Sequence, residues 1–377
     1  MVCTPALYSA GGVERVVSVK TSYFADILGY DVTIIVTEGK GKPLFFPLSE
    51  RVKVTNLGIN FEELWHQPFY RKVFLYLKKQ FQYKKLLTSE LMRIHPDITI
   101  SVLRREINFI TKVKDGSKKV GELHVNRKNY RNFEAGDTNV VKWLFAKFWM
   151  RNLIKHLKEL DGMVVLTESE KVAWPELSNV NVIPDPLSFS RKECSSLTRK
   201  RIISIGRYAY QKGVDMLLQA WAKIEKDYPD WELVYFGQGD KTPYDQQMNE
   251  LGIDTCRCLL NDKTSDVMKE LQDSSLFVLS SRFEGFGMVL VEAMACGLPV
   301  ISFDCKSGPG EIISDGEDGY LVLADDIDGL AGKMSYLIAN PELRTRFGRN
   351  AFQNSSRYNI DGVAKQWVQL FNKLTKI

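Results

Sequence analysis

The chain has 377 residues, of which 44% are hydrophobic and 26% charged, with a formal net charge of +5. This composition is typical of a folded globular protein, and the length suffices for two domains. The most apolar stretch, residues 288–303, is interrupted by Glu292, Gly297 and Pro299, so the sequence excludes a membrane-spanning helix. Positive charge is concentrated in residues 66–160, which hold 21 Lys and Arg against 8 Asp and Glu. Such a region predicts an anionic partner, for example a membrane surface, a nucleic acid or a polyphosphate.

The N-terminus and the cysteines indicate a cytoplasmic protein. No basic leader precedes an apolar core, so we expect no secretory signal. The six cysteines are scattered along the chain, as free thiols in a reducing compartment usually are. Cys256 and Cys258 form only a C-x-C pair without a nearby histidine, which argues against a metal site there.

The first half alternates predicted strands and helices. In chain order we expect a strand at 2–4, a helix over 13–28, strands at 32–36 and 52–57, a basic helix over 69–94, strands at 98–102 and 119–123, a helix over 140–160 and a strand at 162–166. Three residues before Pro5 are few for a central strand, and we hypothesise that the reading frame starts further upstream. The two prolines in Val182-Ile-Pro-Asp-Pro-Leu187 exclude a helix and indicate a domain boundary.

The second half repeats the alternation more regularly, after a polar linker at 188–201. We expect strands at 201–205, 232–236, 276–279 and 300–303, and helices at 214–226, 242–251, 265–274, 288–296 and 360–375. This pattern predicts an α/β fold with a doubly wound parallel sheet in each half, two Rossmann-like domains facing a cleft. Ligands of such sheets bind at the carboxyl ends of the strands.

A segment that opens the helix at 288–296 is the most informative part of the chain. Glu284 and Glu292 lie eight residues apart across a glycine-rich turn, and Gly285 and Gly287 allow a ligand to approach the backbone. The free N–H groups and the positive end of the helix favour an anion. This arrangement predicts a phosphorylated sugar or nucleotide, with carboxylates that bind hydroxyl groups. The alternative is that Glu284 only caps the helix and that Glu292 is a solvated surface charge.

Two further loops of the second half contain candidate residues. Ile205-Gly-Arg-Tyr-Ala-Tyr-Gln-Lys-Gly213 connects a strand to a helix, so Arg207 and Lys212 can reach the strand ends. Two cations there suit a leaving nucleoside diphosphate, whose charge grows as its bond to the sugar breaks. Taken alone, such a loop is equally well a solvated surface. Gly237 and Gly239 form another turn at a strand end, a pattern that is weak by itself.

Three features of the first half are less specific. Gly11 and Gly12 enter the first long helix, either as an anion site or as a plain capping turn. His124 ends a predicted strand, where a single histidine is more often structural than functional. The helix at 140–160 mixes aromatic and basic residues, so that it could lie on an anionic membrane or pack its aromatic face into the domain.

Taken together, these motifs resemble the signature of glycosyltransferase family 4, retaining enzymes of the GT-B architecture, over residues 10 to about 320. The resemblance implies that Arg207 and Lys212 bind the donor diphosphate, that Glu292 binds the ribose and that Glu284 lies near the reacting sugar. It places Gly11 and Gly12 near the donor phosphates and gives His124 a hydrogen bond to the donor sugar. It also implies a nucleotide pocket lined by Gly237, Gly239, Gly285, Phe286, Gly287 and Met288.

The resemblance further implies an N-terminal acceptor-side domain (1–187, with 358–377 crossing back) and a C-terminal donor-binding domain (188–357). The expected reaction is retaining transfer of a hexosyl group from a nucleotide-diphosphate sugar, expected to be a UDP-sugar, to a glycan or polyprenyl-linked acceptor in polysaccharide biosynthesis. No metal or cofactor is expected. The location implied is cytoplasmic, with peripheral contact at the inner face of the membrane. Asn261 stands where the family usually has glycine, which leaves the base open.

Two alternatives remain at this point. A nucleotide-sugar epimerase shares the two-domain architecture, although its histidine and acidic pattern fits this chain less well. A nucleic-acid-binding protein would use the basic residues 66–160, but no recognition motif accompanies those charges.

Overall fold

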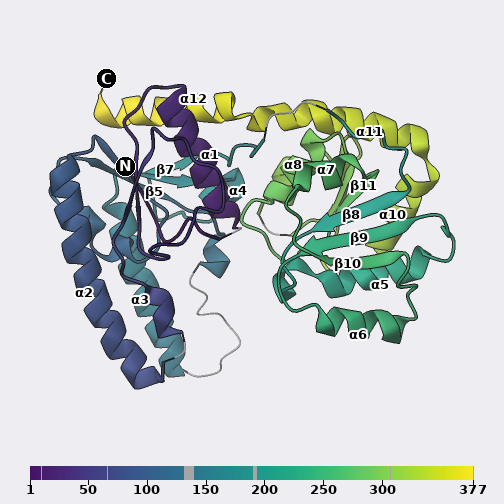
Figure 1. Ribbon diagram of the computed structural model, residues 1–377, viewed down its shortest axis with the longest axis horizontal. Coiled ribbons are helices and arrows are strands. Elements are labelled where there is room, and N and C mark those ends of the chain that lie inside the picture. Colours follow the sequence, from purple (N-terminus) through teal and green to yellow (C-terminus); the bar gives the residue numbers. More distant parts are fainter. Residues whose placement is uncertain (10, 66, 131–139, 190–192, 306, 377) are drawn as a thin grey trace. The chain divides into compact units, whose positions relative to one another are not determined.

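A computed structural model describes residues 1–9, 11–65, 67–130, 140–189, 193–305 and 307–376, with only the backbone of residues 69, 129 and 140–146 (Figure 1). The contacts between residues divide the chain into unit 1 (Met1–Ser188 with Ile360–Ile377) and unit 2 (Phe189–Asn359). Every paired strand in both units runs parallel to its neighbours. The predicted doubly wound parallel sheet in each half is thereby confirmed.

The described residues of unit 1 form a seven-stranded sheet. Its spatial order is β3 (Lys53–Asn56), β2 (Thr33–Val36), β1 (Val2–Thr4), β4 (Ile98–Ser101), β5 (Lys118–Glu122), β6 (Gly162–Val165) and β7 (Val180–Val182). The longer helices of the unit are α1 (Gly12–Asp26), α2 (Phe69–Ile94), α3 (Val140–Lys158) and α12 (Ile360–Thr375). A short helix, α4 (Glu168–Val172), follows β6, and short 3-10 turns lie at Phe61–Leu64, Glu106–Asn108, Ile110–Lys112 and Arg127–Asn129.

Alternation along the strands divides the core of unit 1 between the two faces of the sheet. Successive side chains of a strand point to opposite faces. Ile34 and Val36 of β2 pack with α1 and α12, whereas Ile35 between them packs with α2. On the latter side α2 contributes three buried residues of its second half, Tyr83, Leu87 and Leu91.

The predicted aromatic and basic helix is α3, and most of its described apolar side chains pack inside unit 1. Leu153 and Leu157 are buried, and Trp149 packs against the same cluster, while Phe148 is exposed. The side chains of residues 140–146 lie outside the described part. Packing therefore accounts for most of the described apolar side chains of this helix.

The described residues of unit 2 form a six-stranded sheet in the order β10 (Cys258–Asp262), β9 (Glu232–Gly237), β8 (Arg201–Ile205), β11 (Leu276–Leu279), β12 (Val300–Phe303) and β13 (Gly319–Val322). Its helices are α5 (Val214–Ile224), α6 (Thr242–Leu251), α7 (Val267–Gln272), α8 (Met288–Ala295), α9 (Pro309–Ile312), α10 (Ile327–Ala339) and α11 (Pro341–Asn354), with 3-10 turns at Tyr210–Lys212 and Ser355–Tyr358. All six cysteines of the chain are free thiols, as predicted.

Candidate active site

The strand order of unit 2 reverses between β8 and β11. From β8 the order runs outward through β9 and β10, and from β11 it runs outward through β12 and β13. In open parallel sheets, ligands bind at the carboxyl ends of the strands beside such a switch point. Arg207 and Lys212 follow β8, and Glu284 and Gly285 follow β11. Four predicted residues thus come from the two loops that flank the switch point.

Lys212 and Glu284 form an ion pair at this edge. Nζ of Lys212 lies 2.6 Å from Oε1 of Glu284, and the hydroxyl of Ser281 donates to the same oxygen at 2.6 Å. The two charged side chains are only 16% and 7% exposed, so both are largely removed from water. The ammonium has three N–H donors, and within the described residues only Glu284 accepts from it. Lys212 is therefore held in place with donors left for an anionic ligand.

Backbone contact between the two loops explains the last glycine of the first one. Gly213 has a φ of +60°, and a Cβ there would lie 2.0 Å from the carbonyl oxygen of Ser280. Only glycine fits such a position. Nε2 of Gln211 also donates to the carbonyl of Phe283 at 3.0 Å, and N of Arg282 donates to the carbonyl of Gln211 at 2.8 Å. The loops after β8 and β11 therefore form one packed unit.

Arg207 lies in the same loop but does not join the ion pair. Its side chain is exposed, and Nη2 donates to Oε1 of Gln211 at 3.0 Å. Gln211 thus supports both the guanidinium of Arg207 and the loop that carries Glu284.

Two glycines, Gly237 at the end of β9 and Gly239 after it, allow a third loop to approach. A Cβ on Gly237 would lie 2.1 Å from the carbonyl oxygen of Gly206, and one on Gly239 would lie 2.8 Å from that of Tyr208. Gly239 also has a φ of +134°. Backbone packing therefore explains both glycines, and their contact with a nucleotide stays a prediction.

Glu292 lies inside helix α8 and is 3% exposed, which rules out a solvated surface charge. The helix begins at Met288, after Gly287, whose φ of +103° suits glycine. The loop before this helix carries Glu284 and the half-buried Gly285, and it leads directly into the N-terminal N–H groups of α8. The fifth residue of the helix is thus a buried carboxylate, and burial of a charge is costly unless polar groups satisfy it.

Phe286 has a structural role that the sequence pattern leaves open. Its ring is buried and meets Tyr358 edge to face, with ring centroids 5.4 Å apart. A Cβ on Gly308 would lie 2.0 Å from the carbonyl oxygen of Phe286, so the loop after β12 lies directly on this backbone. Phe286 therefore anchors the turn that bears the two glutamates.

At the N-terminus of α1 the carboxylate of Glu14 lies beside Gly11. A Cβ there would lie 1.9 Å from Oε2 of Glu14, and the hydroxyl of Ser9 donates to the other oxygen of that carboxylate at 2.8 Å. An acidic side chain over a helix N-terminus is stabilising. Around Gly12 no described atom lies within 4 Å of a Cβ. Ala10, which precedes both glycines, lies outside the described residues.

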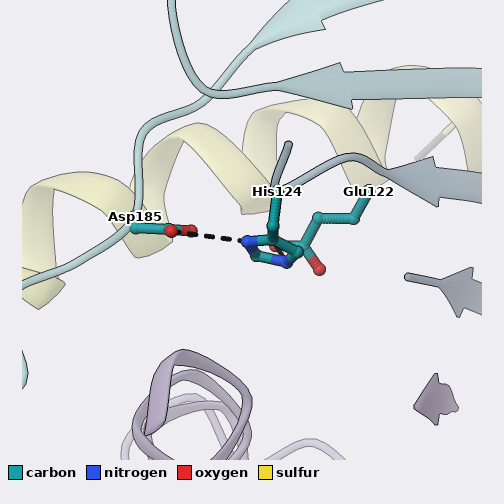
Figure 2. A group of neighbouring side chains, drawn as sticks. All are labelled: Glu122, His124 and Asp185. Carbon is teal, nitrogen blue, oxygen red and sulfur yellow. Dashed lines mark hydrogen bonds and ion pairs between the residues drawn. The ribbon is translucent and has the colours of Figure 1, made fainter. Parts of the chain in front are cut away.

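His124 lies between two carboxylates in unit 1 (Figure 2). Nδ1 is 3.3 Å from Oδ2 of Asp185, which follows β7, and Nε2 is 3.6 Å from Oε1 of Glu122, at the end of β5. Glu122 in turn pairs with Lys20 of α1. All four side chains are almost completely buried. Two acidic and two basic groups therefore form a closed network of charges.

The charges of this network shift two pKa values. Burial lowers the pKa of His124, but the carboxylates of Asp185 and Glu122 outweigh burial and raise it to about 9. Burial raises the pKa of Glu122, yet Lys20 and His124 outweigh it and lower this pKa to about 2. At neutral pH the imidazole is therefore protonated and the carboxylate of Glu122 is ionised.

Glu122, His124 and Asp185 are also the one group of described residues whose ligand atoms, all within 4.8 Å of one another, could hold a metal. A metal requires a neutral imidazole, whereas here the two carboxylates stabilise the protonated form. Lys20 adds a positive charge next to Glu122. We interpret the group as a network of ion pairs that is neutral without a metal.

His124 also lines a small hollow at the carboxyl edge of the sheet of unit 1. Its walls come from the start of α1, the end of β4 and the loop after β5, and the lining residues are Val13, Val102, Arg104, Leu123, His124, Val125 and Tyr130. Nε2 of His124 is buried and faces Glu122 at 3.6 Å, which is longer than a hydrogen bond.

We expect one imidazole to titrate near pH 9 in an NMR titration of the four histidines of the sequence. His124→Gln should remove that resonance, and Asp185→Asn should lower its pKa toward 6.5. Because the folded state holds this proton more tightly, its stabilisation is fully present below pH 6.5 and is lost as the pH rises through 9. Asp230→Asn, which changes an exposed carboxylate, is the control. Four histidines that all titrate near 6.5 would contradict the network.

Two parallel-sheet domains of this kind are the GT-B architecture. Residues 188–354 match the family described as "Glycosyl transferases group 1". This domain is a glycosyltransferase group 1 domain, and the chain is a glycosyltransferase.

Similar proteins agree with this assignment. The chain is 29% identical over 366 residues to an uncharacterized glycosyltransferase of Haemophilus influenzae, which covers 95% of this chain and 96% of the relative. It is 24% identical over 373 residues, 97% of this chain and 96% of the relative, to the GalNAc-alpha-(1->4)-GalNAc-alpha-(1->3)-diNAcBac-PP-undecaprenol alpha-1,4-N-acetyl-D-galactosaminyltransferase of Campylobacter jejuni.

A solved structure shares the fold over almost the whole chain. A TarM variant of Staphylococcus aureus in complex with fondaparinux, alpha-GlcNAc-glycerol and UDP superposes with a TM-score of 0.77. The match covers 98% of this chain and 99% of that chain, at 17% identity. At this identity, the likeness shows the fold alone.

Sequence reasoning misses three polar partners in the two sites. Asp185 lies in the stretch interpreted as a domain boundary, 61 residues from His124. Lys20 lies 102 residues from Glu122 on a helix that reads as ordinary. Ser281 is adjacent to the glutamate motif, and its hydroxyl three residues before Glu284 is a signal that could have been used.

Proposed function

We propose that this chain is a retaining glycosyltransferase of family 4 that transfers a hexosyl group from a UDP-sugar to a lipid-linked glycan acceptor. The observation that carries the proposal is the buried pair of Lys212 and Glu284 at the switch point of unit 2. The glutamate motif and the lysine come from separate loops, and the structure joins them with Ser281.

In this proposal different residues of unit 2 bind different groups of the donor. Lys212 and Arg207 stabilise the negative charge that develops on the leaving diphosphate, helped by the N–H groups at the start of α8. Glu292 accepts hydrogen bonds from the ribose hydroxyls, as a carboxylate can from two donors. Gly285, Gly287 and Met288 line the same pocket by resemblance.

The ion pair with Lys212 and the hydrogen bond from Ser281 draw electron density from the Glu284 carboxylate, which makes it a weaker nucleophile. We therefore propose front-face displacement. The bond between the anomeric carbon and the diphosphate oxygen breaks, and the acceptor oxygen attacks from the same face. The acceptor proton passes to the departing phosphate oxygen. Because the new bond forms on the face that the diphosphate leaves, the configuration is retained without a covalent intermediate.

The choice of donor and acceptor rests on similar proteins. The Campylobacter jejuni relative is named for an undecaprenol-linked acceptor, and the TarM complex contains UDP. A lipid-linked acceptor would place this protein at the cytoplasmic face of a membrane as a peripheral protein, whereas no nucleic-acid partner is proposed. Within the described residues no helix is both long and apolar enough to cross a bilayer.

A panel of UDP-, GDP- and dTDP-sugars tests the proposal. Purified protein should be stabilised against heat by UDP-sugars and should hydrolyse one of them slowly, with the α-anomer of the sugar released first in an NMR time course. Release of the β-anomer first would overturn the retaining mechanism. Accumulation of an epimerised sugar nucleotide would instead support the epimerase, and stabilisation by no member of the panel would overturn the donor assignment.

We expect donor turnover to be unchanged in EDTA. The cations Arg207 and Lys212 supply the charge that a divalent ion would supply in a metal-dependent enzyme. The measurement is the rate of UDP release before and after chelation. The counter-experiment is readdition of Mg²⁺ or Mn²⁺, and a rate that rises more than about tenfold on readdition would contradict the proposal.

A further inference from the structure

Helix α2 has two apolar faces, of which only one packs against its own domain. Tyr83, Leu87 and Leu91 are buried in the core of unit 1. On another side of the helix four large side chains are each between 62% and 73% exposed: Tyr70, Phe74, Leu77 and Phe81. Figure 1 shows α2 as a long helix at the outside of unit 1. We call these four residues the α2 stripe.

The stripe is a continuous surface. At about 100° per residue, the four side chains fall within an arc of about 60°. Val73, which is also exposed, widens the arc to about 100°. Single exposed apolar residues are normal in a globular protein, but a contiguous row of this size marks an interaction surface.

Cations border the stripe. Arg71, Lys78 and Lys85 recur every seven residues along one edge, about 20–60° from Phe74 on the helical wheel. All three are exposed, and none forms an ion pair with another residue that the structure describes. Over its whole length α2 has seven Lys and Arg and one acidic residue, Glu90.

We propose that the α2 stripe docks the protein onto an anionic membrane surface. An aromatic and aliphatic face bordered by long cations suits the boundary between acyl chains and headgroups, because the cations reach the lipid phosphates while the apolar face inserts by about 5–10 Å. The inference rests on the geometry of α2 and does not depend on the catalytic assignment. It also places the membrane contact on α2.

The charge and the apolar surface of α2 favour a membrane over two other partners, a second copy of the chain and a nucleic acid. A second copy of the chain would bring two strongly basic helices face to face, which like charges disfavour. A nucleic acid would satisfy the cations but would leave an aliphatic and aromatic arc without an apolar partner, because its phosphate surface is polar. An anionic lipid surface offers partners to both the apolar stripe and the cations that border it.

Vesicle flotation of the full chain without sugar nucleotide tests the proposal. We expect binding to phosphatidylcholine vesicles that contain about 30% phosphatidylglycerol, and at least about tenfold weaker binding to pure phosphatidylcholine. Phe74→Ser with Phe81→Ser should weaken binding by about 100-fold, since two buried aromatic side chains are lost. Val172→Ser with Leu323→Ser, which change exposed apolar residues elsewhere, should have no effect.

The contribution of the bordering cations to vesicle binding is tested with separate variants. Each cation near an anionic leaflet strengthens binding by a factor of about five, so replacing Arg71, Lys78 and Lys85 with glutamine should weaken it by about 100-fold. The matched control replaces the exposed Lys226, Lys269 and Arg349 with glutamine, with the same change in net charge. Equal effects of the two triple variants would overturn the proposal. A wild-type dimer that dissociates when Phe74 and Phe81 are replaced with serine would also overturn it. So would a protein that binds RNA, with or without the two serine substitutions, but does not bind vesicles.

Discussion

Replacing Lys212 with methionine should lower the turnover number kcat by about 10³, the effect of losing one preorganised donor to a developing negative charge. The ammonium is fixed by Glu284 at 2.6 Å, so it pays little reorganisation when the diphosphate leaves. Steady-state kinetics with the preferred donor measure the change. The donor KM should change much less than kcat, because the interaction strengthens in the transition state.

The same substitution should also destabilise unit 2, which needs a separate control. Removing one partner of a buried pair leaves the other charge without compensation and costs about 3 kcal/mol. Lys212→Met with Glu284→Gln removes both charges, so it should recover most of the stability but none of the lost turnover. Lys223→Met, which breaks an exposed pair with Asp328, should change neither quantity. If the double variant recovers activity together with stability, Lys212 acts only as a structural residue.

The sequence predicts the order of strands and helices well where apolar runs alternate with helical periods. Leu276–Leu279 and Met288–Ala295 are such a pair, and the structure places both where the pattern indicates. The sequence does not predict β10, since Asn261 and Asp262 make the last two residues of that strand polar. Nor does it indicate β7, whose last residue, Val182, begins the proline-rich stretch interpreted as a boundary. Tertiary pairing overrides local composition in both strands.

The sequence likewise predicts some residues of the candidate site and not others. Lys212 and Glu284 were expected at strand ends, and the reversal of strand order explains why two distant loops meet. The partners of His124 could not be predicted, because a single histidine gives no indication of which carboxylates a seven-stranded sheet will bring to it. Charge that is buried and paired over long sequence separations leaves no periodic signal.

Replacing Glu292 with alanine should raise the donor KM by about 100-fold and change kcat by less than about threefold. A carboxylate that accepts two ribose hydroxyls makes charge-assisted hydrogen bonds, together worth about 3 kcal/mol. These bonds lie away from the reacting carbon and are equally strong in the ground state and the transition state, so their loss appears in KM. Glu292→Gln keeps one acceptor and should raise KM by about tenfold.

A donor that lacks the 2′-hydroxyl of the ribose separates this role from a structural one. If Glu292 binds that hydroxyl, the wild type should lose affinity for the deoxy donor, whereas Glu292→Ala should treat both donors nearly alike. Met294→Leu, a change of similar volume two residues further along the buried face of α8, should leave the difference between the donors intact. An equal loss of affinity for the deoxy donor in wild type and Glu292→Ala would mean that the carboxylate supports the helix and does not contact the ribose. The burial of Glu292 makes this comparison necessary, because a buried carboxylate can stabilise the fold, bind a ligand or do both.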